Sequence, residues 1–339
     1  MKAISSLAKD AIVFATYGEI LFELALEKGV DGDLLLERSG IRESVLRNPD
    51  AMLSNEQFVA LVRHTLEMTA TPSLGLSYGA RLTFTTHGSM AQAAISSESL
   101  GKALVMLEKY YRIRFAFIEW KFFTEGDEAV LQLDENLGLE DLTPFVVECL
   151  FVALMMVNFL LFGTKLMRTG RCLLSYPRPD YADEYDTYFH ASVEFDQPVN
   201  QLRFDKQFLD LPLALSNPVA QRVAEKDCEA QLRSLAQHET IVIKVKRMLQ
   251  SEQGPIPSME DVADMLHMTS RTLRRQLQSF DTSFQDILNE VRKKRALAML
   301  RATDKSVDDI AHALGYSDPS NFGRAFRKWT GKSPSDFRV

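Results

Sequence analysis

The residues best suited to chemistry in this chain are arginines on two short segments near its C-terminus. The first segment carries Arg271, Arg274 and Arg275. At helical spacing they fall on the face opposite Leu273 and Leu277. A guanidinium group can donate two hydrogen bonds to O6 and N7 of guanine in a major groove, or bind phosphate oxygens. The pattern predicts contacts with DNA, and a solvated charge or a salt bridge is the alternative for any single arginine.

The second segment has fewer side-chain donors at the matching positions, which are Pro319, Ser320, Gly323 and Arg324. Because proline and glycine offer no side-chain donor, this half is expected to read fewer bases and to act mainly by contacting phosphates. For Arg275 and Arg324 a salt bridge within the module remains an alternative, since a repeat would preserve them for either reason.

The elements that carry these arginines have the features of helix-turn-helix units. In the second unit Ser306 and Asp318 are N-cap candidates, and Pro319 suits the first position of the following helix. Gly315 stands between the two helices, where a backbone with positive φ would end the first one. Two short helices joined by such a turn, the second one basic, are typical of a unit that enters a DNA major groove.

The unit occurs twice in the chain. Residues 258–280 match residues 306–329 at an offset of 48 before the turn and 49 after it. Ala263 and Ala311 are small where the two helices of each unit must approach closely. Two ordinary amphipathic helix pairs would also show periodic apolar residues. The repeated arginines favour DNA binding because they stand on a face that a core would not use.

The last hundred or so residues resemble the signature of the AraC/XylS family of transcription regulators. The matching residues are Gly315, Tyr316, Asp318, Ser320, Phe322, Arg324, Phe326, Gly331, Ser333, Pro334, Phe337 and Arg338. Arg292, Ala296 and Leu300 look like the family's linker helix. His267 departs from the family, which often has glycine at this turn, but histidine tolerates a left-handed backbone better than most residues.

The resemblance implies which residues contact DNA. In the first unit they are Thr269, which would also cap the recognition helix, Arg271, Thr272, Arg274 and Arg275. In the second unit they are Ser320, Gly323 and Arg324.

Residues from about 15 to 215 resemble the ligand-binding domain of one AraC subgroup, which includes ornithine-utilisation regulators and several virulence or quorum-sensing regulators. The similar segments are LFELALEKGVDGDLLLERSGI, NPDAMLSNEQF, PSLGLSYGARL and YFHASVEFDQPVNQLRFDKQFLDLPL. They consist mostly of packing residues, so the resemblance implies a domain but identifies no ligand. Arg112 or Arg114 could pair with an effector carboxylate, or could simply be exposed at a helix end, and His87 is a comparable candidate. No effector-binding residue is assigned.

The length of the chain and the distribution of its charge indicate two domains, one acidic and one basic. A chain of 339 residues with a net charge of −7 suggests two domains and, taken whole, would argue against nucleic acid. Residues 241–339, however, hold 17 Lys and Arg against 12 Asp and Glu, a net of +5 that leaves −12 on the remainder. A basic module joined to an acidic one fits a DNA-binding protein with a separate regulatory domain.

The predicted fold is an α+β N-terminal effector domain followed by an all-α domain of two helix-turn-helix units joined by a linker helix. The expected boundaries are 1–215 for effector binding and dimerisation, 216–238 for a joining helix and 239–339 for DNA binding. Apolar periodicity predicts a helix over 5–29, with Ile12, Val13, Ile20, Leu21, Leu24 and Leu26 in the core. A hairpin is expected at 115–123 and 129–133, and short strands at 172–176, 193–195 and 201–204.

Several other functions are disfavoured by the sequence. Three widely spaced cysteines and six scattered histidines indicate a reducing cytoplasm and neither disulfides nor a metal site. Catalytic motifs are lacking, and no cofactor or signal peptide is expected. Residues 145–162 are nearly long enough to span a bilayer, but Glu148 and Asn158 would be costly there, so a buried helix is expected and no membrane partner.

The leading hypothesis is a bacterial, cytoplasmic and nucleoid-associated regulator that binds promoter DNA. Activation is the commoner habit of the family, and RNA polymerase is then a partner. The N-terminal domain would control DNA binding through an unknown small-molecule effector or through homodimerisation. The alternatives are a small-molecule sensor or enzyme-like domain fused to a helical protein-interaction module, and a structural helical interaction protein.

Overall fold

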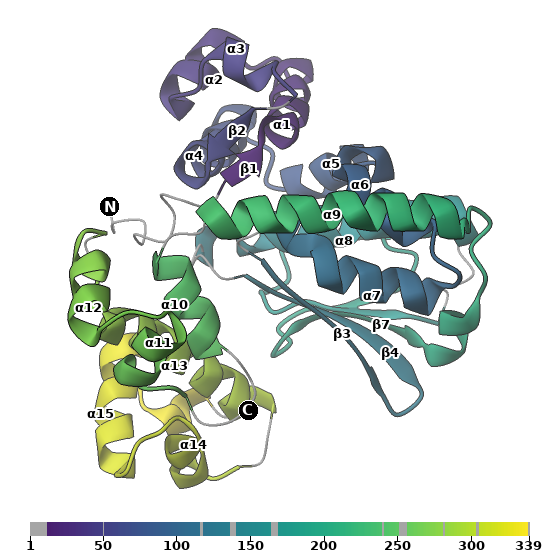
Figure 1. Cartoon of the computed structure of the whole chain (residues 1–339). Coiled ribbons are helices and arrows are strands. Elements are labelled where there is room, and N and C mark those ends of the chain that lie inside the picture. The colour runs from purple at the N-terminus through teal and green to yellow at the C-terminus, as the bar shows by residue number, and fades with distance from the viewer. Residues whose placement is uncertain are drawn as a thin grey trace. The chain divides into compact units, whose positions relative to one another are not determined.

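The computed structural model describes residues 12–49, 51–115, 118–135, 140–163, 169–238, 241–250, 256–280, 282–302 and 305–337. The chain forms two compact units, one that ends at His238 and one that follows it. The N-terminal unit combines helices with a sheet, and the C-terminal unit is built from helices (Figure 1). The predicted fold class is confirmed.

A five-stranded sheet with the order β3-β4-β7-β5-β6 forms one layer of the N-terminal unit. The strands are β3 (Ile118–Glu125), β4 (Glu128–Glu135), β7 (Asn200–Asp205), β5 (Arg171–Leu173) and β6 (Ser192–Glu194). Neighbouring strands are antiparallel except β5 and β6, which are parallel. The predicted hairpin and the three short strands are confirmed, with the hairpin turn at Gly126 and Asp127.

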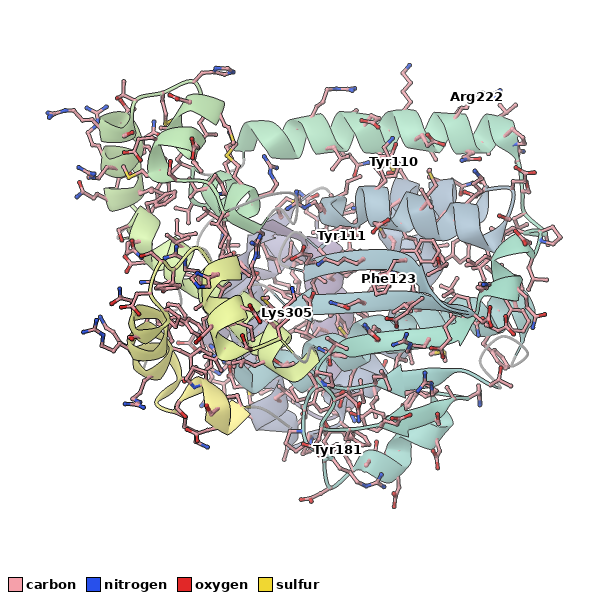
Figure 2. All side chains as sticks on the ribbon, turned by 90° about the horizontal axis from the view of Figure 1, so that it is seen from below. Tyr110, Tyr111, Phe123, Tyr181, Arg222 and Lys305 are labelled. Atoms are coloured by element: carbon pink, nitrogen blue, oxygen red, sulfur yellow. The ribbon has the colours of Figure 1, made fainter. Side chains whose placement is uncertain are left out.

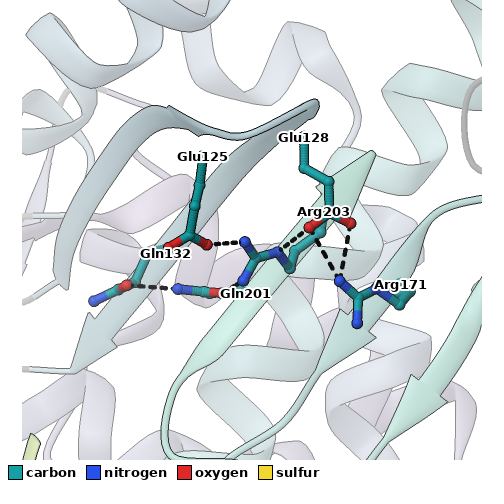
Figure 3. Close-up of polar contacts among 6 residues, drawn as sticks. All are labelled: Glu125, Glu128, Gln132, Arg171, Gln201 and Arg203. Atoms are coloured by element: carbon teal, nitrogen blue, oxygen red, sulfur yellow. Dashed lines mark hydrogen bonds and ion pairs between the residues drawn. The ribbon is translucent and has the colours of Figure 1, made fainter. Parts of the chain in front are cut away.

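The face of this sheet that points away from the core carries a network of ion pairs (Figure 3). Glu128 of β4 accepts hydrogen bonds from Arg203 of β7, at 3.0 Å, and from Arg171 of β5, at 2.9 and 3.0 Å. Arg203 also pairs with Glu125 of β3. These side chains tie four strands together on the polar face, while alternate residues such as Leu131 are buried in the core.

Helices lie on the apolar side of the sheet in more than one layer. The strands β3 and β4 contact α7 (Leu100–Tyr110) and α8 (Thr143–Phe162), respectively. Helix α6 (Gly88–Ile95) packs against α7, and α9 (Pro218–His238) packs against α6. Figure 1 shows α7 between the sheet and α9. In Figure 2 Tyr110, at the end of α7, faces α9, and Arg222 projects from the opposite side of α9. The Tyr110 hydroxyl donates a hydrogen bond of 2.9 Å to Glu229, so α9 is docked on the N-terminal unit.

Helix α8 is long and apolar enough to cross a membrane by length and composition, the one such helix among the described residues. Ten of its residues, between Phe145 and Met155, are buried in the core. Glu148, in this buried part, accepts hydrogen bonds of 2.7 and 2.5 Å from the hydroxyls of Tyr181 and Tyr185. These features agree with the expected core helix, since a hydrogen-bonded carboxyl in a protein core avoids the cost that it would have in lipid.

Two glycines allow α5 (Leu74–Arg81) to pack closely against α8. A Cβ atom at Gly75 would lie 2.8 Å from the Phe145 carbonyl oxygen, and one at Gly79 would lie 2.5 Å from that of Cys149. Larger residues would therefore force the two helices apart.

The predicted helix over 5–29 is wrong in its first part. Residues up to 11 lie outside the described residues, and β1 (Ile12–Phe14) pairs antiparallel with β2 (Met52–Ser54). The helix α1 begins only at Ala15 and ends at Glu27, with Leu21 and Leu24 buried but Leu26 37% exposed. Ile, Val and Phe favour strands, and pairing with a distant segment overrode the local helical pattern.

Further short elements complete the N-terminal unit. The α-helices are α2 (Gly32–Ser39), α3 (Glu43–Leu46) and α4 (Asn55–Thr69). The 3-10 helices are η2 (Phe84–His87), η3 (Tyr111–Ile113), η4 (Glu140–Leu142), η5 (Ala182–Thr187) and η6 (Lys206–Asp210). A capping box begins α4, because Ser54 accepts a hydrogen bond from the Gln57 backbone and the Gln57 side chain accepts one from the Ser54 backbone.

The C-terminal unit contains six α-helices and one 3-10 helix within the described residues. They are α10 (Ile241–Gln250), α11 (Met259–Met265), α12 (Ser270–Gln278), α13 (Phe284–Ala302), α14 (Val307–Ala313), α15 (Pro319–Thr330) and η7 (Pro334–Phe337). Helices α11 and α12 form the first predicted helix-turn-helix unit, and α14 and α15 form the second.

Candidate nucleic-acid interface

Each helix-turn-helix unit begins with the same cap. Ser258 accepts a hydrogen bond of 3.1 Å from the Asp261 backbone, and the Asp261 carboxylate accepts one of 2.9 Å from the Ser258 backbone. Ser306 and Asp309 repeat this arrangement at 3.0 and 3.2 Å. Hydrogen bonds from Ser306 lower the pKa of Asp309, so the carboxylate stays charged at the positive end of the helix. The predicted N-cap at Ser306 is confirmed.

The turns of the two units share one backbone conformation. His267 has a φ of 55° and Gly315, at the equivalent position, has a φ of 78°. The left-handed backbone predicted for both positions is confirmed. Asparagine, aspartate and histidine are the side chains that enter this region most readily, which explains why the departure at His267 preserves the turn.

The recognition helices α12 and α15 begin as expected. Thr269 caps α12 by accepting a hydrogen bond of 3.2 Å from the Thr272 backbone. Asp318 caps α15 by accepting one of 2.8 Å from the Ser320 backbone, and Pro319 occupies the first helical turn. At the N-terminus of each recognition helix, a side chain of the protein therefore accepts a hydrogen bond from a backbone N–H that has no partner within the helix.

Both recognition helices bury one side and expose the other. Leu273 and Leu277 of α12 are fully buried, as are Phe322 and Phe326 of α15. The opposite side of α12 exposes Arg271, Arg274, Arg275 and Gln278, and that of α15 exposes Ser320, Asn321, Arg324, Arg327 and Lys328. In Figure 1 α12 and α15 lie along one edge of the C-terminal unit. Their exposed donors can therefore form one interface.

The arginines of the two helices differ in their partners. Arg271, Arg274 and Arg275 form no ion pair within the described residues, so their guanidinium groups are available to bind DNA. Arg324 instead donates a hydrogen bond of 2.6 Å to Asn321, one turn earlier on the same helix. Asn321 was not among the predicted site residues. Asn321 stands at the position that matches Thr272 in the repeat. Because Thr272 was a predicted DNA contact, this match could have pointed to Asn321.

The linker helix α13 contributes to two separate cores. Ile287, Leu288 and Val291 pack with α10, α11 and α12, whereas Ala296 and Leu300 pack with α14 and α15. One continuous helix therefore fixes both recognition helices. At 1.5 Å per residue its 19 residues extend roughly 28 Å.

Polar contacts add to this bracing. Arg292 of α13 donates a hydrogen bond of 2.9 Å to the Leu314 carbonyl in the turn of the second unit. Arg295 donates one of 3.0 Å to the Leu249 carbonyl at the end of α10, and Lys246 of α10 forms an ion pair of 2.6 Å with Glu290. The sequence marked Arg292 as a linker-helix residue but did not predict these contacts.

Two of the effector candidates considered from sequence, Arg114 and His87, lie next to each other in the N-terminal unit. Arg114 is buried rather than exposed: its Nε donates a hydrogen bond of 3.0 Å to the His87 carbonyl, and its guanidinium lies over the ring of Phe14. His87 lies 2.8 Å from the Tyr17 hydroxyl, and burial together with the charge of Arg114 lowers its pKa to about 4. The lowered pKa favours the neutral imidazole at pH 7, and the contacts of Arg114 are with His87 and Phe14 of its own chain.

Known protein families match both the N-terminal and the C-terminal part of the chain. Residues 29–213 match the arabinose-binding N-terminal domain of the AraC transcription regulator, and residues 262–339 match a helix-turn-helix domain. The ornithine utilization regulator of Pseudomonas aeruginosa is 37% identical over 96% of each chain. The regulator VqsM of the same organism is 31% identical over 45% of this chain and 48% of its own.

Among solved structures, the transcriptional regulator CdpR from Pseudomonas aeruginosa aligns over 90% of this chain and 96% of its own, with 24% identity and a TM-score of 0.45. The matched domains and the named relatives are regulators of transcription rather than enzymes. The chain therefore belongs to the AraC family of DNA-binding transcription regulators.

Proposed function

We propose that this protein is a transcription activator that binds promoter DNA with both helix-turn-helix units. The observation that carries the proposal is the pair of exposed donor faces on α12 and α15, both anchored to the single helix α13. In the first unit Thr269, Arg271, Thr272, Arg274 and Arg275 contact bases and phosphates. In the second unit Ser320, Gly323 and Arg324 mainly contact phosphates.

Control of DNA binding is assigned to the N-terminal unit. Residues 1–215 bind a small-molecule effector and form a homodimer, residues 216–238 join the two functions, and residues 239–339 bind DNA. Once on the promoter, the activator contacts RNA polymerase, and it acts in the bacterial cytoplasm on nucleoid DNA. The match to an arabinose-binding domain supports an effector of low molecular mass.

Footprinting tests the DNA-binding part. Because α13 holds the two recognition helices a fixed distance apart, one protomer should protect two short elements about 10 bp apart on one face of the duplex. A duplex with the same composition in scrambled order is the control and should be bound more weakly. A single contiguous contact per protomer, or equal binding of both duplexes, would contradict the proposal and favour a protein-interaction module.

A further inference from the structure

Two neighbouring cavities lie between the sheet and the helices α6, α7 and α8. Their volumes are about 100 and 90 Å³. They share the wall residues Ala94, Ile95, Leu107, Leu154 and Val157. Their summed volume exceeds the ~150 Å³ of an engineered protein cavity that binds benzene, so one site made of both would hold a ligand larger than benzene.

The lining of these cavities is apolar. Among the described residues, neither cavity is lined by Asp, Glu, Lys or Arg. His87 reaches the first cavity, but its lowered pKa keeps it neutral. A charged ligand would therefore lose its hydration without gaining an opposite charge.

Two buried polar atoms at these cavities lack a partner within the described structure. Trp120 lines the first cavity, is 8% exposed, and its Nε1–H donates to no acceptor. Asn158 lines the second cavity, and its buried Oδ1 accepts no hydrogen bond. Leaving a buried donor or acceptor without a hydrogen bond destabilises the folded state, because the group has lost its contact with water. A ligand group that hydrogen-bonded to one of these atoms would remove that part of the cost.

We propose that the two cavities form one binding site for an uncharged, largely aliphatic molecule with a single polar end. In the second cavity its polar end donates an N–H or O–H to Asn158 Oδ1, and its aliphatic chain extends into the first cavity, which Trp120 lines. Medium-chain amides and hydroxyketones belong to this class, whereas amino acids and carboxylates do not. The inference rests on the proposed effector control and names the class of effector and its site.

The site is placed to influence α9. Helix α6 supplies Ala94 and Ile95 to the cavity wall and packs against α9 on its other side. Its Ser89 hydroxyl accepts a hydrogen bond of 2.9 Å from Gln231 of α9, and Ala93 packs in a cluster with Cys228. A ligand that moves α6 therefore also moves the helix that leads to the DNA-binding unit.

Octanamide is the first probe, titrated into the full chain with the substitution Trp329→Phe. The chain has two tryptophans, so the remaining fluorescence comes from Trp120. We expect a saturable change in its emission, with octanoate and L-ornithine binding at least tenfold more weakly. Equal or tighter binding of either charged compound would overturn the inference. So would the absence of saturable binding by hexanamide, octanamide and decanamide.

Asn158→Leu tests the hydrogen bond proposed in the second cavity. It should weaken octanamide at least tenfold and leave methyl octanoate unchanged, because the ester has no N–H to donate. Equal loss for both probes would mean that the substitution only disturbs packing, and the assignment of Asn158 would fall. Ala94→Leu, which fills the shared wall, should reduce binding of both probes, with circular dichroism used to verify that the variant is folded.

A DNA titration separates this inference from the proposed function. If octanamide binds and changes the affinity for promoter DNA, both stand. If it binds without changing that affinity, the binding site stands and effector control through it is contradicted. If the chain without octanamide does not bind promoter DNA, the proposed function is contradicted and the ligand-binding site is not.

Discussion

The guanidinium of Arg292 lies over the ring of Tyr316, 4.5 Å from its centroid, and joins the linker helix to the turn of the second helix-turn-helix unit. The same side chain donates a hydrogen bond to the Leu314 carbonyl. Arginine suits this position because its flat group can stack and donate at once. The spacing between the two recognition helices therefore depends on a residue that need not touch DNA.

Arg292→Ala should destabilise the C-terminal unit by about 1–3 kcal/mol, since a charged donor and a cation–π contact are both lost. Thermal unfolding monitored by Trp329 fluorescence, in a chain that also carries Trp120→Phe, would measure this. Arg271→Ala is the control, because Arg271 is exposed and should leave the unfolding temperature unchanged. An Arg292 variant as stable as this control would show that the stacking contributes nothing.

Arg274→Ala should reduce discrimination at one or two base pairs by about 1–3 kcal/mol. Ser320→Ala should weaken binding less and leave the sequence preference largely intact, because the second recognition helix has fewer donors. Affinities for a set of single-base-pair substitutions would separate the two effects. If the second unit dominates this scan, the assignment of base reading to α12 is wrong.

The local features of the DNA-binding unit could be predicted because they depend on neighbouring residues. Caps such as Ser306 and turns such as Gly315 are determined within a few positions. Features that depend on distant segments could not be predicted this way. Val13 pairs with Leu53, so residues 12–14 form a strand where the sequence predicted a helix. The cavity at Trp120 forms only when the sheet packs against three helices, and the periodicity of the sequence does not predict this packing.

Gly323→Ala should stabilise α15 by about 0.5–1 kcal/mol, because alanine favours helices and a Cβ atom there would meet nothing within 4 Å. Because the added methyl group is small and offers no donor, the same change should leave DNA affinity nearly unchanged. Gly323→Arg places an arginine at the position that matches Arg274 and should strengthen binding and steepen its salt dependence. Unfolding and DNA titrations on both variants test this, and an unchanged DNA affinity of the arginine variant would remove Gly323 from the interface.

Glu148 should make the stability of the N-terminal unit depend on pH. Burial raises its pKa to about 7, above the value of 4.5 for an exposed glutamate. The folded chain therefore keeps this proton at pH values where the unfolded chain has lost it. Stability from this group is present below pH 4.5 and is lost as the pH rises through 7, by about 3 kcal/mol.

Glu148→Gln should remove this dependence, because glutamine is neutral and can still accept from Tyr181 and Tyr185. Urea unfolding between pH 4.5 and 8.5, with Glu37→Gln as an exposed control, would measure the difference. A Glu148 variant whose stability falls with pH as steeply as the parent chain would mean that another group titrates.

A fragment of residues 241–339 should bind DNA by itself, but weakly, because it contains both recognition helices and lacks the domain expected to dimerise. On DNA with sites for two protomers the full chain should bind 10²–10⁴-fold more tightly, since linking two modules raises their effective concentration. Sedimentation of the full chain and the fragment, with titrations on single and double sites, measures both effects. The effector can shift this arrangement only by its differential affinity for the two states. Equal affinity on the double site, together with a monomeric full chain, would exclude control by dimerisation and leave a mechanism within one chain.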